Sequence, residues 1–102
     1  MTDKNIEELR TILTHYGKQG QVMKLREELS ELIEAIDDVG KVDTGLTRAH
    51  FIEELADVSI MVEQMKLALN LGEQQEYYKM INFKIQRQLG RIRKEQNDDE
   101  SP

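Results

Sequence analysis

Apolar residues recur every three or four positions along most of the chain, which is the pattern of helices that bury one face. The first two such segments are predicted at residues 3–16 and 21–38, with Asp3 as the N-cap of the first. Glycines follow both segments and are expected to end them: Gly17, Gly20 and Gly40. The N-terminal part of the chain is therefore predicted to be a pair of helices.

Two further helices are predicted in the second half of the chain. Residues 40–45 contain turn-forming residues and are expected to be a loop, after which Thr47 can cap a helix that reaches Leu71. Gly72 is expected to end that helix, and residues 73–96 again show apolar positions at helical spacing. The pattern thus predicts an all-α fold of four helices.

The same pattern sets the domain organisation. Residues 1–96 are predicted to form a single all-α domain, whereas residues 97–102 contain no apolar side chain and are predicted to be a disordered acidic tail. A chain of 102 residues is small and buries only part of its surface alone, so completion of the bundle by oligomerisation is expected.

Composition supports the helical prediction and excludes several classes of function. Charged residues make up 33% of the chain and aromatic residues 5%, which is typical of long surface helices rather than of a sheet. The net charge of −6 argues against nucleic acid as a partner, and the absence of cysteine excludes disulfides and thiolate metal sites. The polar residues 1–5 lack the core of a secretion signal, and charges interrupt the apolar stretch 55–71. We therefore expect a cytoplasmic protein without a membrane partner.

Two carboxylate pairs lie at matching positions on the second and third predicted helices. At about 100° per residue, Glu28 and Glu31 border the apolar stripe of one helix, as Glu54 and Asp57 border that of the next. Packing of the two stripes would bring the four acids together, where they repel unless some are protonated or a cation neutralises them. A set of oxygen ligands without His or Cys favours magnesium, manganese or calcium. Glutamate pairs on helices are also common as ordinary solvated surface, and this alternative stays open.

The last predicted helix is basic. Between Tyr77 and Lys94 there is no Asp or Glu, and Lys84, Arg87 and Arg91 follow one another at spacings that place them on one side. Such cations suit the phosphate oxygens that a metal leaves unbound, although they could equally balance the acidic helices by surface ion pairs.

The motifs together resemble those of the MazG-type all-α nucleoside triphosphate pyrophosphohydrolases. That family's pattern is Glu-Glu-x-x-Glu followed, one to three dozen residues later, by Glu-x-x-Asp, and residues 27–31 and 54–57 match it in that order. Residues 20–25 and 79–87 are also similar to segments of family members, so the resemblance covers about residues 17–93.

The resemblance implies a site, a reaction and an assembly. It implies Mg²⁺, or Mn²⁺, bound by four acids: Glu28, Glu31, Glu54 and Asp57. Glu27 would orient a ligand or a basic side chain, and the phosphates would be bound by Lys79, Asn82, Lys84 and Arg87. The implied reaction is hydrolysis of a (deoxy)nucleoside triphosphate between its α and β phosphates, as nucleotide-pool housecleaning by a homodimer or homotetramer with a four-helix, MazG-like bundle.

Two other functions remain open from the sequence. The related phosphoribosyl-ATP pyrophosphohydrolases use the same scaffold, and a non-catalytic helical oligomerisation or regulatory module could carry matched acidic and basic faces. His15 and His50 stand in no metal-binding spacing, so structural or surface roles are expected for them. No feature of the sequence identifies the base or the sugar.

Overall fold

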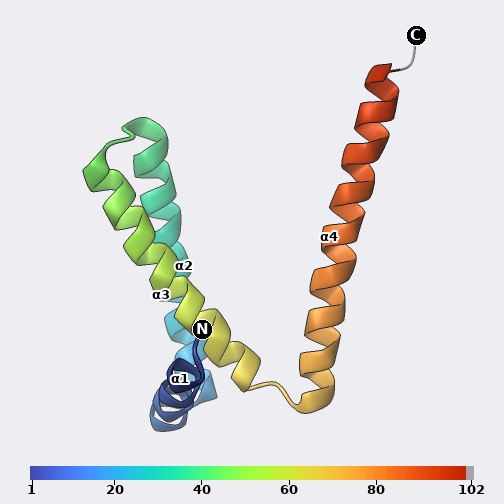
Figure 1. The fold of residues 1–102 in the computed structure, drawn as a ribbon. Coiled ribbons are helices and arrows are strands. Elements are labelled where there is room, and N and C mark those ends of the chain that lie inside the picture. The colour runs from blue at the N-terminus through green and yellow to red at the C-terminus, as the bar shows by residue number, and fades with distance from the viewer. Residues whose placement is uncertain (101–102) are drawn as a thin grey trace. The chain divides into compact units, whose positions relative to one another are not determined.

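The computed structural model describes residues 1–100 as helical except for short connections. The elements are α1 (Asp3–Tyr16), α2 (Lys18–Lys41), α3 (Gly45–Leu67) and α4 (Leu71–Glu100), shown in Figure 1. No strand occurs in this part of the chain, so the predicted all-α class is confirmed. The chain divides into two compact units, one comprising residues 1–68 and the other beginning at Leu69. The predicted single domain with a four-helix bundle stays a prediction.

Helix α1 has the predicted bounds but a different cap. The Thr2 hydroxyl accepts a hydrogen bond from the Asn5 backbone N–H at 3.1 Å, and the Asn5 side chain accepts one from Thr2 N at 3.3 Å. This reciprocal capping box makes Thr2 the N-cap, one residue before the predicted cap, Asp3. The helix ends at Gly17, whose φ of 83° and ψ of 154° are open to glycine but strained for residues with a Cβ.

Helix α2 is longer at both ends than predicted. It begins at Lys18 and continues through Gly20 and Gly40 to Lys41. Gly17 is the one residue with a positive φ in the part of the chain described, so it alone makes the turn between the first two helices. The prediction that Gly20 and Gly40 bound this helix was wrong, because an isolated glycine weakens a helix without breaking it.

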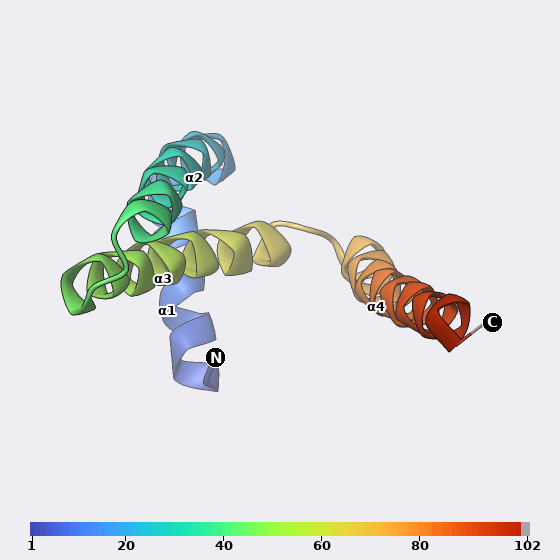
Figure 2. The same cartoon turned by 90° about the horizontal axis from the view of Figure 1, so that it is seen from above.

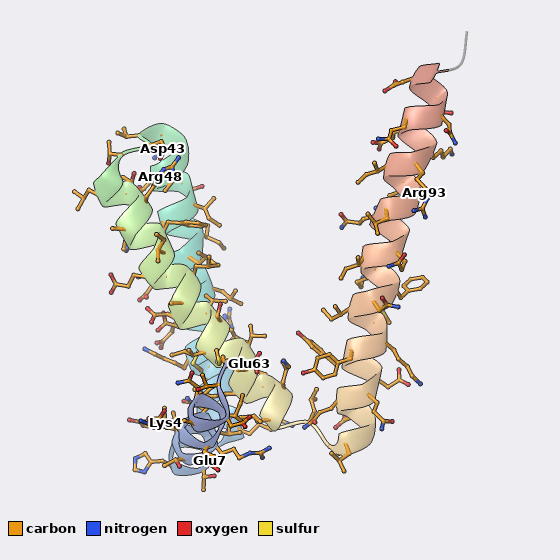
Figure 3. The ribbon with its side chains drawn as sticks, in the orientation of Figure 1. Lys4, Glu7, Asp43, Arg48, Glu63 and Arg93 are labelled. Carbon is orange, nitrogen blue, oxygen red and sulfur yellow. The ribbon has the colours of Figure 1, made fainter. Side chains whose placement is uncertain are left out.

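The loop after α2 comprises only residues 42–44. Thr44 is the N-cap of α3, and Thr47 is its capping-box partner rather than the cap that the sequence predicted. Beside the loop, Arg48 Nη2 donates to Asp43 Oδ2 at 2.9 Å, and Figure 3 shows both side chains. A tight capped turn therefore joins α2 to α3.

Helix α3 ends at Leu67, earlier than the predicted Leu71, because Asn70 already caps the start of α4. Asn70 Oδ1 accepts a hydrogen bond from Glu73 N at 2.8 Å, and Glu73 Oε1 accepts one from Asn70 N at 3.0 Å. This third reciprocal capping box places Gly72 inside the first turn of α4, not after the end of α3.

Helix α4 continues to Glu100, through the first four residues of the segment predicted to be a disordered tail. Neither glycine nor proline interrupts the sequence between Gly90 and Pro102, so backbone hydrogen bonding can continue through the polar residues. The last two positions of the predicted tail, 101 and 102, lie outside the described residues.

The first unit is a helical hairpin with a third helix across it. Helices α2 and α3 lie side by side and antiparallel, and α1 lies near the end remote from their loop (Figure 1). Figure 2 shows from above that α1 crosses α3. The buried apolar side chains are few: Leu9, Ala35, Val58 and Met61. Four polar side chains are equally buried: Gln21, Glu28, Glu54 and Gln64. The interior of this unit is therefore unusually polar.

Candidate metal centre

The face of α2 that packs on α3 is centred on Glu28. Gln21, Ala35 and Glu28 are buried, and at the helical repeat of about 100° per residue Gln21 and Ala35 each lie about 20° from Glu28, on opposite sides of it. The prediction that this acid borders the apolar stripe was thus wrong, since it lies in the middle of the contact. Apolar positions on the other side of the predicted stripe are exposed: Val22, Leu29, Ile33 and Ile36.

Helix α3 repeats the arrangement around Glu54. Glu54, Val58 and Met61 are buried, and Asp57 is half-buried at one side of them. Outward-facing apolar residues again remain exposed: Ile52, Leu55 and Ile60. The two helices therefore meet through faces that each carry a glutamate near the centre, and the hairpin brings these glutamates together.

The carboxylates form two overlapping groups. One oxygen each of Glu28, Glu31 and Glu54 lie within 4.8 Å of one another, and the same holds for Glu53, Glu54 and Asp57. Three of the four predicted acids thus share one group, while Asp57 joins through Glu54, which belongs to both. We call these five residues the acid cluster. Glu31 and Glu53 are exposed at its rim.

Glu28 and Glu54 are each only 7% exposed, and in each carboxylate one oxygen lies near a basic side chain while the other has no partner among the described residues. Glu28 Oε1 lies 3.3 Å from Lys24 Nζ, and Glu54 Oε1 lies 3.3 Å from His50 Nε2. Neither Oε2 atom has a hydrogen-bond partner among the described residues. Buried polar atoms are nearly always paired, because an unpaired one costs free energy. These two oxygens are the unexplained feature of the core.

Lys24 also contacts Glu27, the acid predicted to orient a neighbouring side chain. Its Nζ lies 3.4 Å from Glu27 Oε2, so two carboxylates hold one ammonium group. The Glu28 carboxylate, and after it the Glu27 carboxylate, raises the pKa of Lys24 above its ordinary value. Lys24 is therefore a fixed positive charge beside the acid cluster at neutral pH.

The acid cluster suits a hard divalent cation. All its ligand atoms are carboxylate oxygens, which magnesium and manganese prefer. A cation bound through the two Oε2 atoms would give each of them the partner that the described residues do not supply. The geometry offers no sulfur or nitrogen ligand that would favour zinc or copper within these groups. The residues present therefore fit the predicted kind of metal, without distinguishing Mg²⁺ from Mn²⁺.

The residues predicted to bind phosphate lie on α4, in the second unit. All four are exposed: Lys79, Asn82, Lys84 and Arg87. The Arg87 guanidinium carbon lies 6.0 Å from the centre of the Phe83 ring, at the outer limit of a cation–π contact. Their role in phosphate binding stays a prediction.

A groove opens between α1, α2 and α3 beside the acid cluster. Its volume is about 490 Å³, and apolar side chains form much of its wall. The lining residues are Ile12, Tyr16, Gly20, Gln21, Met23, Lys24, Glu27, Ile60, Met61 and Gln64. Because Lys24 and Glu27 line the groove while Lys24 pairs with Glu28, the groove reaches the edge of the acid cluster.

Sequence reasoning missed several residues that the structure brings to this region. His50 was expected to have an ordinary structural or surface role, yet it pairs with Glu54. Glu53 joins the acid cluster, and its signal was the Glu-Glu doublet that mirrors Glu27 and Glu28. Lys24 and His50 each precede a buried glutamate by one helical turn, a spacing visible in the sequence.

No protein-family model, curated protein or solved structure matches this chain. The resemblance to the MazG-type enzymes therefore rests on the residues of the motifs themselves. The acid cluster is the structural feature that points most directly to a function.

Proposed function

We propose that the protein is a magnesium-dependent hydrolase that converts (deoxy)nucleoside triphosphates to nucleoside monophosphates and pyrophosphate. The observation that carries this proposal is the pair of unpartnered, buried oxygens, Glu28 Oε2 and Glu54 Oε2, within a set of converging carboxylates. Maintaining such a costly arrangement is understandable if a cation completes it. The order and spacing of the acid motifs support the particular reaction.

In this proposal Glu28, Glu31, Glu54 and Asp57 hold Mg²⁺ or Mn²⁺, with Glu53 at the rim. When bound, a divalent cation polarises phosphate oxygens and lowers the pKa of a coordinated water. An ionised carboxylate of the acid cluster accepts the proton that the attacking water loses. The water oxygen forms a bond to the α phosphorus as the bond to the oxygen bridging α and β breaks, so that pyrophosphate leaves.

The groove is proposed to hold the organic part of the substrate. Its volume and apolar walls suit a nucleoside, and Gln21 and Gln64 provide amide groups at the wall. The triphosphate would extend toward Lys24 and the acid cluster. On α4 the exposed cations Lys84 and Arg87 are proposed to bind phosphate oxygens, which their charge supports.

We further propose a cytoplasmic homodimer or homotetramer. The first unit exposes an apolar face on each helix of its hairpin, including Ile33 on α2 and Ile52 on α3. α4 exposes another along its length, including Ile81 and Ile85. Surfaces of this kind are typical of proteins that bury more area by association. Among the described residues, no helix combines the length and apolar character needed to cross a membrane.

Pyrophosphate release from a panel of nucleoside triphosphates tests the reaction. We expect release that requires Mg²⁺ or Mn²⁺ and falls at least 100-fold in Glu31→Ala and Asp57→Ala. Glu34→Ala, which removes an exposed acid of α2 outside the acid cluster, should retain full activity. Phosphoribosyl-ATP belongs in the same panel, because preferential turnover of it would assign the related pyrophosphohydrolase reaction. Absence of release from every substrate would overturn the enzyme proposal and favour a helical interaction module.

Kinetics of α4 variants test the proposed phosphate contacts separately. Lys84→Ala and Arg87→Ala should each lower kcat/KM by about 10- to 150-fold, since each removes a charged hydrogen bond worth roughly 1.5–3 kcal/mol. Lys94→Ala, a change of charge near the other end of the basic stretch, is the matched control. Equal kinetics in all three variants would remove α4 from the site and leave the acid cluster in place.

A further inference from the structure

We infer that Lys24 and His50 are positioning residues, which direct the free oxygens of Glu28 and Glu54 toward a bound cation. This inference rests on the cation site of the proposed function. Neither basic residue belongs to the acid motifs, and His50 stands in no metal-binding spacing. Their assignment comes from what each side chain contacts.

The two contacts repeat one geometry on two helices. Lys24 precedes Glu28 by one turn of α2, and His50 precedes Glu54 by one turn of α3. In each pair the basic nitrogen lies 3.3 Å from Oε1, while Oε2 has no partner in the described part of the chain. Each pair thus divides its carboxylate into one held oxygen and one available oxygen.

This division has a mechanical consequence. The last torsion of a glutamate side chain has no sharp staggered minima, so packing alone leaves the carboxylate plane poorly defined. A contact to one oxygen fixes that plane and hence the direction of the other oxygen. For metal sites in general, groups that hold the ligands in this way affect metal affinity strongly.

If Lys24 acted by its charge alone, it would weaken cation binding instead of strengthening it. Its ammonium group lies beside the acid cluster and is shared between Glu27 and Glu28, so it repels a cation bound there. A lysine that merely competes with the metal would weaken cation binding, and its removal would strengthen binding. A lysine that positions Glu28 must strengthen binding, so the sign of the change separates the two roles.

The experiment measures Mn²⁺ affinity of the full chain by calorimetry or by electron paramagnetic resonance. We expect Lys24→Met and His50→Ala each to bind Mn²⁺ about tenfold more weakly than the wild type. Lys24→Arg and His50→Gln keep an N–H donor at nearly the same place and should restore most of the affinity. Lys18→Met on α2 and His15→Ala on α1 change the same residue types away from the acid cluster and should bind normally.

Circular dichroism of the metal-free variants checks that each retains its helices. The free energies of unfolding of Lys24→Met, Glu28→Gln and the double variant give the coupling energy of the Lys24–Glu28 pair. Unchanged or tighter Mn²⁺ binding in both Lys24→Met and His50→Ala would overturn the positioning role while leaving the proposed function intact. Equal weakening in the control variants would also overturn it. Failure of the wild type to bind Mn²⁺ would overturn the proposed function and this inference together.

Discussion

Gln21 Nε2 of α2 donates a hydrogen bond to Gln64 Oε1 of α3 at 2.7 Å. Both side chains are buried, and Gln64 is only 1% exposed. Gln64 Nε2 in turn lies 3.4 Å from the Ile60 carbonyl oxygen, so the amide has partners on both sides. This bond joins the start of α2 to the end of α3, at the base of the groove next to α1.

The stability losses caused by replacing each of these glutamines should not add when both are replaced. Gln21→Leu or Gln64→Leu leaves a buried amide without its partner, which costs about 1–3 kcal/mol of unfolding free energy. In the double variant neither partner is stranded, so its loss should be smaller than the sum of the single losses. Chemical denaturation of all four proteins measures the coupling, with exposed Gln19→Leu as the control. Additive losses would show that the bond contributes nothing specific.

Two glycines one turn apart should respond to alanine in opposite directions. At Gly17 the φ of 83° strains any residue with a Cβ, so Gly17→Ala should lower the free energy of unfolding by about 1–3 kcal/mol. Gly20 lies within α2, and a Cβ there meets no atom within 4 Å. Gly20→Ala should therefore stabilise the protein by about 0.5–1 kcal/mol. Thermal unfolding checks both, and the same sign for the two would contradict the assigned turn.

The Asp43–Arg48 pair should make a small contribution to stability that is lost at acidic pH. Arg48 donates to the carboxylate and lowers the pKa of Asp43 below its ordinary value, while Asp43 raises the pKa of Arg48. A lowered pKa contributes stability above the ordinary value, near pH 4, and loses it as the pH falls through the folded-state value.

Asp43→Asn should therefore have a lower Tm than the wild type between pH 5 and 7, by an amount typical of an exposed pair, and the difference should shrink in more acidic solution. Thermal unfolding from neutral pH down to values below the ordinary pKa of Asp measures the difference, with exposed Asp37→Asn as a control for loss of one negative charge. A difference that grows on acidification would contradict the direction given for Asp43.

Neutralising a buried glutamate should affect the metal-free and metal-bound proteins differently. Glu28→Gln and Glu54→Gln remove charge from a desolvated position, so the metal-free Tm should stay level or rise. The increase in Tm that Mg²⁺ or Mn²⁺ gives the wild type should disappear, because a ligand stabilises only the state that binds it. Glu34→Gln should keep the full increase. A retained increase in both variants would remove these residues from the metal site.

The sequence predicted the number of helices and the bounds of α1 because helical periodicity is a local property of the chain. It placed the other boundaries less well, since capping depends on side chains that compete for the same backbone groups. Thr44 outcompetes Thr47 as the cap of α3, and the box formed by Asn70 and Glu73 starts α4 before Gly72. Glycine content alone could not decide these cases, as Gly20 and Gly40 within α2 show.

By itself the sequence determined the all-α class and the matching angular positions of Glu28 and Glu54, because both follow from residue identity and a fixed helical repeat. Only the tertiary structure decided that these glutamates lie at the centre of the α2–α3 contact rather than at its border. It alone gave each one a basic partner on one oxygen and left the other oxygen unpaired. The reason is physical: the depth of burial and the direction of a carboxylate depend on how two helices cross, and that is set by packing across the whole interface.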